Sequence, residues 1–187
     1  MLRGRVPPGS TVLDAGCGAG RNLVYLLRAG YRVLGADVDP EAVAAVRRLA
    51  AELAPGTPAD AFRVEPVEAM TFPDAAADVV VSSAVLHFAR DHAHFDAMLR
   101  GTWRVLRPGG LFFCRLAGRT GLEGLAHPRG GGRYALPDGT ERYLVDEARL
   151  RAATEALGGA LLDPLRTTVV HGRRAMTTWV VRKRPDR

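Results

Sequence analysis

Apolar segments of two kinds alternate along the first two thirds of the chain. Short runs rich in Val, Ala and Leu are typical of buried strands, and the longer segments between them repeat apolar positions at helical spacing. This alternation predicts βαβ units with right-handed crossovers, and therefore an α/β fold built on one doubly wound, mostly parallel sheet. The successive segments are TVLDAG, NLVYLLRAG, RVLGAD, PEAVAAVRRLAAEL, AFRVE, DVVVSS, a helix ending in MLRGTWRVL, and GLFFCRL.

Turn-forming residues mark where several of these segments begin or end. Gly30 follows the first helical pattern as a C-terminal cap would, and Pro40 begins the second helix. The sequence RPGG at 107–110 is expected to end the third helix before the fifth strand. The predicted elements therefore have defined boundaries.

The last third of the chain has a different pattern. Residues 117–139 are rich in glycine and show no periodicity, which predicts a long loop that serves as a substrate-binding loop or lid. A helix is expected over about 146–157. Two strands over about 161–170 and 175–182 are expected to form an antiparallel hairpin around the sequence HGRR. The main sheet should thus gain an antiparallel strand at its C-terminal end.

The length and composition are those of one domain, expected to span 1–187, since the apolar fraction is 47%. No window approaches the roughly 20 apolar residues of a membrane span. The start MLRGRVPPGS lacks the apolar centre of a secretory signal, so a cytoplasmic protein is expected. Cys17 and Cys114 are too few for a disulfide framework and lack metal-ligand spacing, which favours reduced thiols.

The formal net charge is +6, but the arginines are scattered along the chain and balanced locally by acidic residues. This distribution argues against a nucleic-acid partner. Lys and Asn occur once each and Gln and Ile are absent, a bias that fits either a GC-rich genome or a heat-adapted host. The sequence does not predict an oligomeric state.

The stretch VLDAGCGAGRN, residues 12–22, predicts a ligand-binding turn. Gly16, Gly18 and Gly20 follow the first strand and open the first helix, where a ligand can approach the backbone closely. The dinucleotide fingerprint G-x-G-x-x-G would require glycine at position 21, where this chain has Arg21. The spacing therefore favours a nucleotide-like ligand other than NAD or FAD.

Two acidic residues indicate the charge of that ligand. Asp14 would repel a pyrophosphate but would attract an ammonium group, and S-adenosylmethionine carries an ammonium, a sulfonium and no phosphate. Asp37 ends the second strand, where a carboxylate can accept hydrogen bonds from both hydroxyls of a ribose. S-adenosylmethionine is accordingly the expected cofactor, with S-adenosylhomocysteine as product.

The ordered motifs VLDAGCGAGRN, GADVDP, TFPDAAADVVVSSAVLHF and RVLRPGGLFF resemble those of class I S-adenosylmethionine-dependent methyltransferases. The resemblance covers about residues 11–116, and TTWVVRK resembles the last strand of that family. It implies the seven-stranded, Rossmann-like methyltransferase fold. More narrowly, GCGAGRN with YLLRAGYRV is similar to the tellurite-resistance-type branch.

The resemblance also implies roles for individual residues. Asp14 and the backbone of 15–20 would meet the methionine end, Asp37 the ribose, and Val38 the adenine. Many relatives have Asp where this chain has Pro66, so either a neighbouring Glu replaces it or the contact with the adenine amino group is lost. The expected cofactor-binding residues are Asp14, Ala15, Gly16, Cys17, Gly18, Gly20, Arg21, Asn22, Asp37, Val38, Val67, Glu68, Ser83 and Ala84.

Several of these assignments have structural alternatives. Cys17 is expected to be a small buried filler rather than a redox residue. Asn22 either caps the first helix or contacts the ligand, and Arg21 either is an exposed surface residue or pairs with the carboxylate of the methionine end. No metal is expected, because His92 and His94 would lie on different faces of one helix, with no thiolate nearby.

The catalytic residues are not predicted, and His87, His127 and Tyr143 are candidates for a general base. A soft nucleophile would need none. His87 follows the fourth strand, where it would either line the substrate pocket or serve the structure. In the tellurite-type branch a His and nearby arginines of the final strands face the substrate, whereas this chain has Leu165 at the corresponding place. The arginines available for an anionic substrate are Arg129 and Arg133 in the loop, beside Tyr134, and Arg166, Arg173 and Arg174 near the end.

The predicted function is transfer of a methyl group from S-adenosylmethionine to a small-molecule acceptor by in-line displacement. With about ten residues before the first strand, no N-terminal cap domain is expected, so the long loop and the strand ends should supply specificity. Two alternatives remain: a nicotinamide-dependent Rossmann-fold reductase, and a protein that binds S-adenosylmethionine without catalysis.

Overall fold

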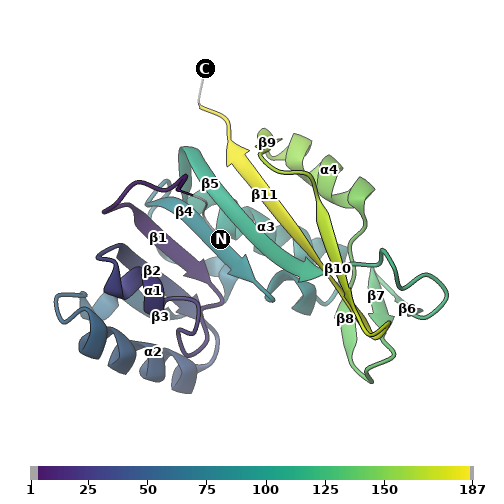
Figure 1. The fold of residues 1–187 in the computed structure, drawn as a ribbon, viewed down its shortest axis with the longest axis horizontal. Helices are drawn as coiled ribbons and strands as arrows, with labels where there is room; N and C mark the ends of the chain where they lie inside the picture. Colours follow the sequence, from purple (N-terminus) through teal and green to yellow (C-terminus); the bar gives the residue numbers. More distant parts are fainter. Residues whose placement is uncertain (1–3, 186–187) are drawn as a thin grey trace.

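The computed structural model describes residues 4–185, which form one large sheet, a small sheet and the helices that cover them. The main sheet has the order β10-β11-β5-β4-β1-β2-β3, and β9 also pairs with β11 (Figure 1). Its strands are β1 (Thr11–Ala15), β2 (Arg32–Asp37), β3 (Phe62–Val64), β4 (Ala77–Ser83), β5 (Leu106–Ala117), β9 (Gly159–Leu161), β10 (Arg166–Val170) and β11 (Arg174–Lys183).

Strands β1 to β5 run parallel, whereas β9, β10 and β11 pair antiparallel. This confirms the predicted α/β fold class and the antiparallel C-terminal hairpin, in which β10 and β11 meet around residues 171–173. No helix among residues 4–185 is long and apolar enough to cross a membrane.

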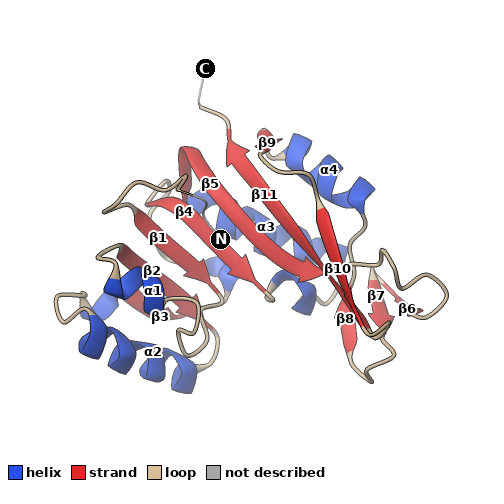
Figure 2. Ribbon diagram, in the orientation of Figure 1, coloured by secondary structure: helices blue, strands red, loops and turns tan. Residues whose placement is uncertain are grey.

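Helices cover both faces of the main sheet (Figure 2). One apolar core lies between the sheet and α1 and α2, and a second core lies between the sheet and α3 and α4. Three helices begin at an aspartate N-cap, because the side chains of Asp39, Asp91 and Asp146 each accept a hydrogen bond from a backbone N–H of the first turn. The helices are α1 (Val24–Arg28), α2 (Pro40–Leu53), α3 (His92–Val105) and α4 (Glu147–Ala156), with short 3₁₀ turns η1 (Ala59–Ala61), η2 (Val67–Ala69) and η3 (Leu86–Phe88).

Four local predictions differ from the structure. The single strand expected over about 161–170 is divided into β9 and β10. Helix α1 is regular over only five residues, shorter than its apolar pattern indicates. The segment 107–110 lies within β5, where the pairing with β4 is irregular, rather than in a separate turn. Part of the expected loop 117–139 forms two strands, β6 (His127–Gly130) and β7 (Arg133–Ala135).

The strands β6, β7 and β8 (Glu141–Tyr143) form the small antiparallel sheet. It is attached to the main body by a third apolar cluster, in which Leu122, Leu136 and Leu144 pack with Met176 of β11. Figure 1 shows this sheet beside the far end of the β10–β11 hairpin. The small sheet therefore forms one wall of the region beyond the carboxyl ends of β4 and β5. Its role as a lid stays a prediction.

Candidate functional site

The glycine loop after β1 is held against the end of β2 by its own amides. The N–H groups of Gly16 and Cys17 donate to the carbonyl oxygen of Ala36 at 2.8 and 3.0 Å, and Gly18 N–H donates to Asp37 Oδ2 at 2.8 Å. Gly20 N–H donates to the carbonyl of Cys17. Because these amides already have partners, they are not free donors for a ligand. The loop instead has a fixed shape that lets a ligand come close to the backbone.

Glycine is required at two positions of the loop for different structural reasons. Gly16 has φ +87°, and a Cβ there would lie 2.3 Å from Cγ2 of Val85. Gly20 has φ +84°, and a Cβ there would lie 2.6 Å from Cγ2 of Val46 on α2. Gly16 lines the cleft described next, whereas Gly20 lets the loop pack against a helix.

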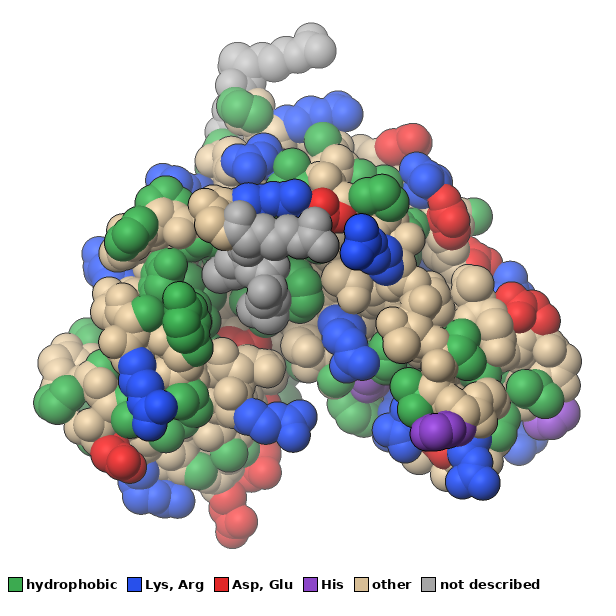
Figure 3. All heavy atoms as spheres, in the orientation of Figure 1, with side chains coloured by type: hydrophobic (Ala, Val, Ile, Leu, Met, Phe, Trp, Pro, Cys, Tyr) green, Lys and Arg blue, Asp and Glu red, His purple; other side chains and the backbone are tan. Residues whose placement is uncertain are grey.

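A cleft of about 370 Å³ opens beyond the carboxyl ends of the parallel strands; we call it the acidic cleft. Its wall includes the exposed apolar side chains of Val38 and Phe88 beside three carboxylates. Figure 3 shows the surface hollowed between the part that carries α1 and α2 and the part that carries the small sheet. The cleft is lined by Gly16, Asp37, Val38, Glu65, Pro66, Val67, Glu68, Ser83, Ala84, Val85, Phe88, Arg90, His94 and Met98.

Asp14 lies behind the glycine loop at the end of β1 and is fully buried. Within residues 4–185, neither of its carboxylate oxygens has a hydrogen-bond partner. Burial raises the pKa of Asp14 to about 7. The side-chain amide of the neighbouring Asn22 lowers this pKa in part, and the negative charge of Asp37 raises it further. A buried carboxylate of this kind is stabilised by a cation brought to it.

Asp37 is held in place at the end of β2. Its Oδ2 accepts from Gly18 N–H and its Oδ1 accepts from Asp39 N–H at 3.0 Å. The side chain is half-buried and lines the acidic cleft next to Val38. The pair therefore offers a fixed carboxylate and an apolar surface side by side.

The two glutamates that could replace an acid at the Pro66 position already have partners. Glu65 accepts from the backbone N–H of Thr71 at 2.8 Å, and Glu68 Oε1 lies 3.0 Å from His94 Nε2. His94 Nδ1 accepts from Arg90 N–H, so its Nε2 carries the proton that is donated to Glu68. Both carboxylates still line the cleft.

The structure brings together about half of the residues expected to bind the cofactor. Gly16, Asp37, Val38, Val67, Glu68, Ser83 and Ala84 line the acidic cleft. Ala15 at the end of β1 and Cys17 within the loop are buried, whereas Arg21 and Asn22 are exposed. Burial raises the pKa of the Cys17 thiol to about 12, which agrees with a small apolar filler.

A second, larger cavity of about 750 Å³ adjoins the acidic cleft, and Ala84 lines both. We call it the basic cavity, because four arginines and one aspartate line it. Ala84 has φ +65°, a strained conformation for alanine, and its N–H donates to the carbonyl of Arg115 at 2.7 Å. The cavity is lined by Ala84, His87, Arg115, Ala117, Leu136, Asp138, Thr140, Arg142, Val170, His171, Arg173, Arg174 and Met176.

His87 is 6% exposed and lines the basic cavity. Its Nδ1 accepts a hydrogen bond from Ala117 N–H at 3.1 Å, which fixes the proton of the neutral ring on Nε2. Burial, with smaller contributions from Arg142 and Arg115, lowers the pKa of His87 to about 4. The ring is therefore neutral near pH 7 and has one N–H to donate.

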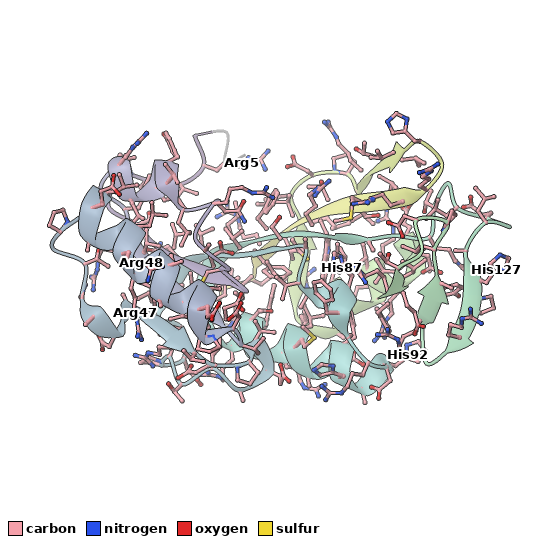
Figure 4. The ribbon with its side chains drawn as sticks, turned by 90° about the horizontal axis from the view of Figure 1, so that it is seen from below. Arg5, Arg47, Arg48, His87, His92 and His127 are labelled. Atoms are coloured by element: carbon pink, nitrogen blue, oxygen red, sulfur yellow. The ribbon has the colours of Figure 1, made fainter. Side chains whose placement is uncertain are left out.

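The other two candidate bases lie outside both cavities. Tyr143 is buried against Phe95, and its hydroxyl is 2.8 Å from Nδ1 of His92. Figure 4 shows His87 near the middle of the molecule and His127 at its outer edge. Arg133 of the expected loop is paired with Glu141. Of the three, only His87 lines one of the two cavities.

Several lining residues were not foreseen from the sequence, among them Arg90 and His94 in the cleft and Arg115 and Arg142 in the cavity. The sequence could have indicated Arg115 as a site residue, because it is a charged residue near the end of the otherwise apolar run GLFFCRLA. It pairs with Ser83 in the β4–β5 register. No sequence pattern indicated Arg142, since its position depends on the small sheet.

Comparison with known proteins places these observations in one family. A family model described as methyltransferase domain matches residues 13–114. The chain is 32% identical over 169 residues to a ubiquinone biosynthesis O-methyltransferase of a Methylobacterium species, covering 87% of this chain and 64% of the relative. It thus spans less than two thirds of that relative's length.

Two solved structures have the same fold. An S-adenosylmethionine-dependent methyltransferase from Methanosarcina mazei superposes with a TM-score of 0.78 at 20% identity, covering 99% of this chain and 97% of the other. The 1,6-didemethyltoxoflavin-N1-methyltransferase of Burkholderia thailandensis, solved with its substrate and S-adenosylhomocysteine, gives 0.72 at 21% identity and covers 98% and 75%. At these identities the likeness concerns the fold.

Proposed function

The chain belongs to the methyltransferase-domain family of class I S-adenosylmethionine-dependent enzymes, and on that premise we propose that it methylates a small-molecule acceptor. The acceptor site proposed is the basic cavity, and the cofactor site is the acidic cleft with the glycine loop behind it. Volumes of several hundred Å³ suit small ligands.

The observation that carries the proposal is the buried, unpartnered carboxylate of Asp14 behind the glycine loop. The ammonium group of the cofactor's methionine end would supply the cation that this carboxylate lacks within the described residues. Two further residues fit the adenosine end of the cofactor. Two hydrogen bonds fix the carboxylate of Asp37 where it could bind the ribose hydroxyls, and the exposed side chain of Val38 could pack on the adenine.

When bound, S-adenosylmethionine supplies a methyl group already activated by a positive sulfur, so the protein's contribution is alignment. Gly16 keeps the loop close to Val85, and Ala84 borders both the cleft and the cavity. The turn at 83–85 would therefore lie where methyl group and acceptor atom meet, at about 3–3.5 Å in an in-line arrangement.

Calorimetric titration tests the cofactor assignment. The purified protein is titrated with S-adenosylmethionine, S-adenosylhomocysteine, NADH and NADPH. We expect micromolar binding of the two adenosyl ligands only. Asp14→Asn should weaken it about a hundredfold or more, since one partner of a buried ion pair is removed, and Asp37→Ala should weaken it by a smaller factor. Glu52→Ala, an exposed carboxylate on α2, is the control.

Binding of the nicotinamides instead would overturn the proposal in favour of a reductase. A second measurement separates an enzyme from a binding protein: transfer of label from methyl-labelled S-adenosylmethionine to a pool of small molecules. Tight adenosyl binding with no transfer to any acceptor would leave the cofactor assignment intact and contradict the methyltransferase activity.

A further inference from the structure

The basic cavity carries a positive charge that the protein itself does not neutralise. Asp138 is the only acidic side chain among the described lining residues, and it lies 3.2 Å from Nε of Arg174. Arg115, Arg142 and Arg173 form no ion pair with any carboxylate among residues 4–185. Three of the four guanidinium groups that line the cavity thus lie outside any ion pair of the described residues, and Asp138 is the one carboxylate near them, so an anion that entered would find positive charge in excess.

These arginines come from three separate elements. Arg115 lies on β5, Arg142 on β8 of the small sheet, and Arg173 in the turn between β10 and β11. Arg142 stacks on the ring of Phe88, with its Cζ 4.8 Å from the ring centroid, and donates to the carbonyl of Glu141. Because Phe88 is a wall of the acidic cleft, this arginine is fixed beside the boundary between the two sites.

His87 adds a neutral donor to the same cavity. Its Nδ1 is occupied by Ala117 N–H, so the only polar atom it can offer a ligand is the protonated Nε2. A donor of this kind suits an acceptor oxygen and cannot take up a proton from a nucleophile. The cavity therefore contains several donors and a single carboxylate.

We propose, resting on the function proposed above, that the methyl acceptor is a small molecule with an anionic oxygen group, a carboxylate or phosphate monoester, bound by Arg115, Arg142 and Arg173. His87 Nε2–H donates to the same ligand. The planar guanidinium groups favour two-pronged contacts with such oxygens. The cavity volume of about 750 Å³ fits a compact molecule rather than a polymer.

Ligand-observed ¹⁹F NMR with a matched library tests the assignment. Fluorinated aromatic carboxylic acids and aryl phosphates are compared with the corresponding primary amides and alcohols, on protein with and without S-adenosylhomocysteine. We expect the anions to bind at least tenfold more tightly than their neutral counterparts. The relative affinities of the acids and the phosphates distinguish the two anion classes.

Substitution locates the binding. Arg115→Gln and Arg142→Gln should each weaken anion binding about tenfold, and Arg48→Gln on α2 should leave it unchanged. Arg48 is exposed and remote from His87 in Figure 4. Using two arginines from different sheets keeps the test decisive if one variant fails to fold. Equal binding of acids and amides, or equal effects of all three substitutions, would overturn the inference.

The role of His87 has its own readout. Long-range ¹H–¹⁵N NMR should find the ring neutral with its proton on Nε2, and the Nε2–H signal should move when an acid is added but not when its amide is added. A proton on Nδ1 would contradict the donor role.

Titration of S-adenosylhomocysteine into the same samples separates the two proposals. Anion preference without adenosyl binding overturns only the proposed function, and adenosyl binding without anion preference overturns only the acceptor class.

Discussion

The acidic cleft and the basic cavity share Ala84, yet they differ in charge and in burial. On the acidic side the decisive carboxylate, Asp14, is fully buried and unpartnered among the described residues. On the basic side the side chains of Arg115 and Arg142 are half-buried and Arg173 is exposed. The proposed cofactor site thus adjoins the proposed acceptor site, and Ala84, with its strained backbone, lines both cavities.

The difference in burial has energetic consequences. A charge out of reach of water is screened little by salt, but it destabilises the folded protein when no counter-ion is present. Charges that water can reach cost little and are screened strongly. The acidic side should therefore affect stability, and the basic side should respond to ionic strength.

The largest expected effect is on stability. The pKa of Asp14 is about 7 in the folded protein, above the ordinary value of 3.8, so the folded state binds more protons between these pH values. The contribution of Asp14 is therefore favourable below about pH 4 and is lost as pH rises through 7. Asp14→Asn should match the wild type at pH 4 and exceed it above pH 7 by up to about 4 kcal/mol.

Urea unfolding without cofactor at pH 4, 6 and 8 measures this difference. Glu52→Gln, on the exposed side of α2, serves as the control and should show no trend with pH. A difference between Asp14→Asn and wild type that stays constant over the whole range would show that the buried carboxylate does not weaken the folded state.

A smaller effect is expected at the boundary between the two sites. Ala84 has φ +65°, where glycine carries no steric penalty, so Ala84→Gly should stabilise the protein by about 0.5–1 kcal/mol. Ala44→Gly, within α2, should destabilise it by about 1 kcal/mol. Denaturant midpoints of the two variants decide the matter, and destabilisation by both would mean that the turn at 83–85 is not strained.

The smallest expected effect is a difference between the two sites in how strongly salt weakens ligand binding. Raising NaCl from 0.05 to 0.5 M should weaken binding of a carboxylic acid probe several-fold, because the Debye length shrinks from about 14 to about 4 Å. Binding of S-adenosylhomocysteine should change less than twofold, since the buried Asp14 is shielded from ions. Calorimetry and ¹⁹F NMR measure the two constants. Equal salt dependence would contradict the contrast between the sites.

Much of the acidic side could be predicted because its residues act within short stretches. Gly16, Asp37 and Val38 reach the cleft through the ends of adjacent strands β1 and β2, and parallel pairing brings such ends to one edge. The partners of Glu65 and Glu68 were not predictable, because each carboxylate bonds to a residue whose side chain is placed by another turn or helix.

The basic side was largely hidden in the sequence. The segment 117–139 showed no periodicity, and its strands are held instead by packing against other parts of the chain. Gly132, for example, lies so close to the ring of Tyr143 that a Cβ there would be 2.4 Å from it. That packing positions β8 and with it Arg142. No local pattern encodes a contact of this kind.

The sequence by itself determined the alternation of strands and helices, the glycine loop and the acids at its two strand ends, because hydrophobic period and turn chemistry are local properties. Only the tertiary structure decided that Asp14 has no hydrogen-bond partner among the described residues, that His87 holds its proton on Nε2, and that four arginines share a cavity. Burial and the convergence of distant side chains arise from packing between elements, which the order of residues along the chain does not display.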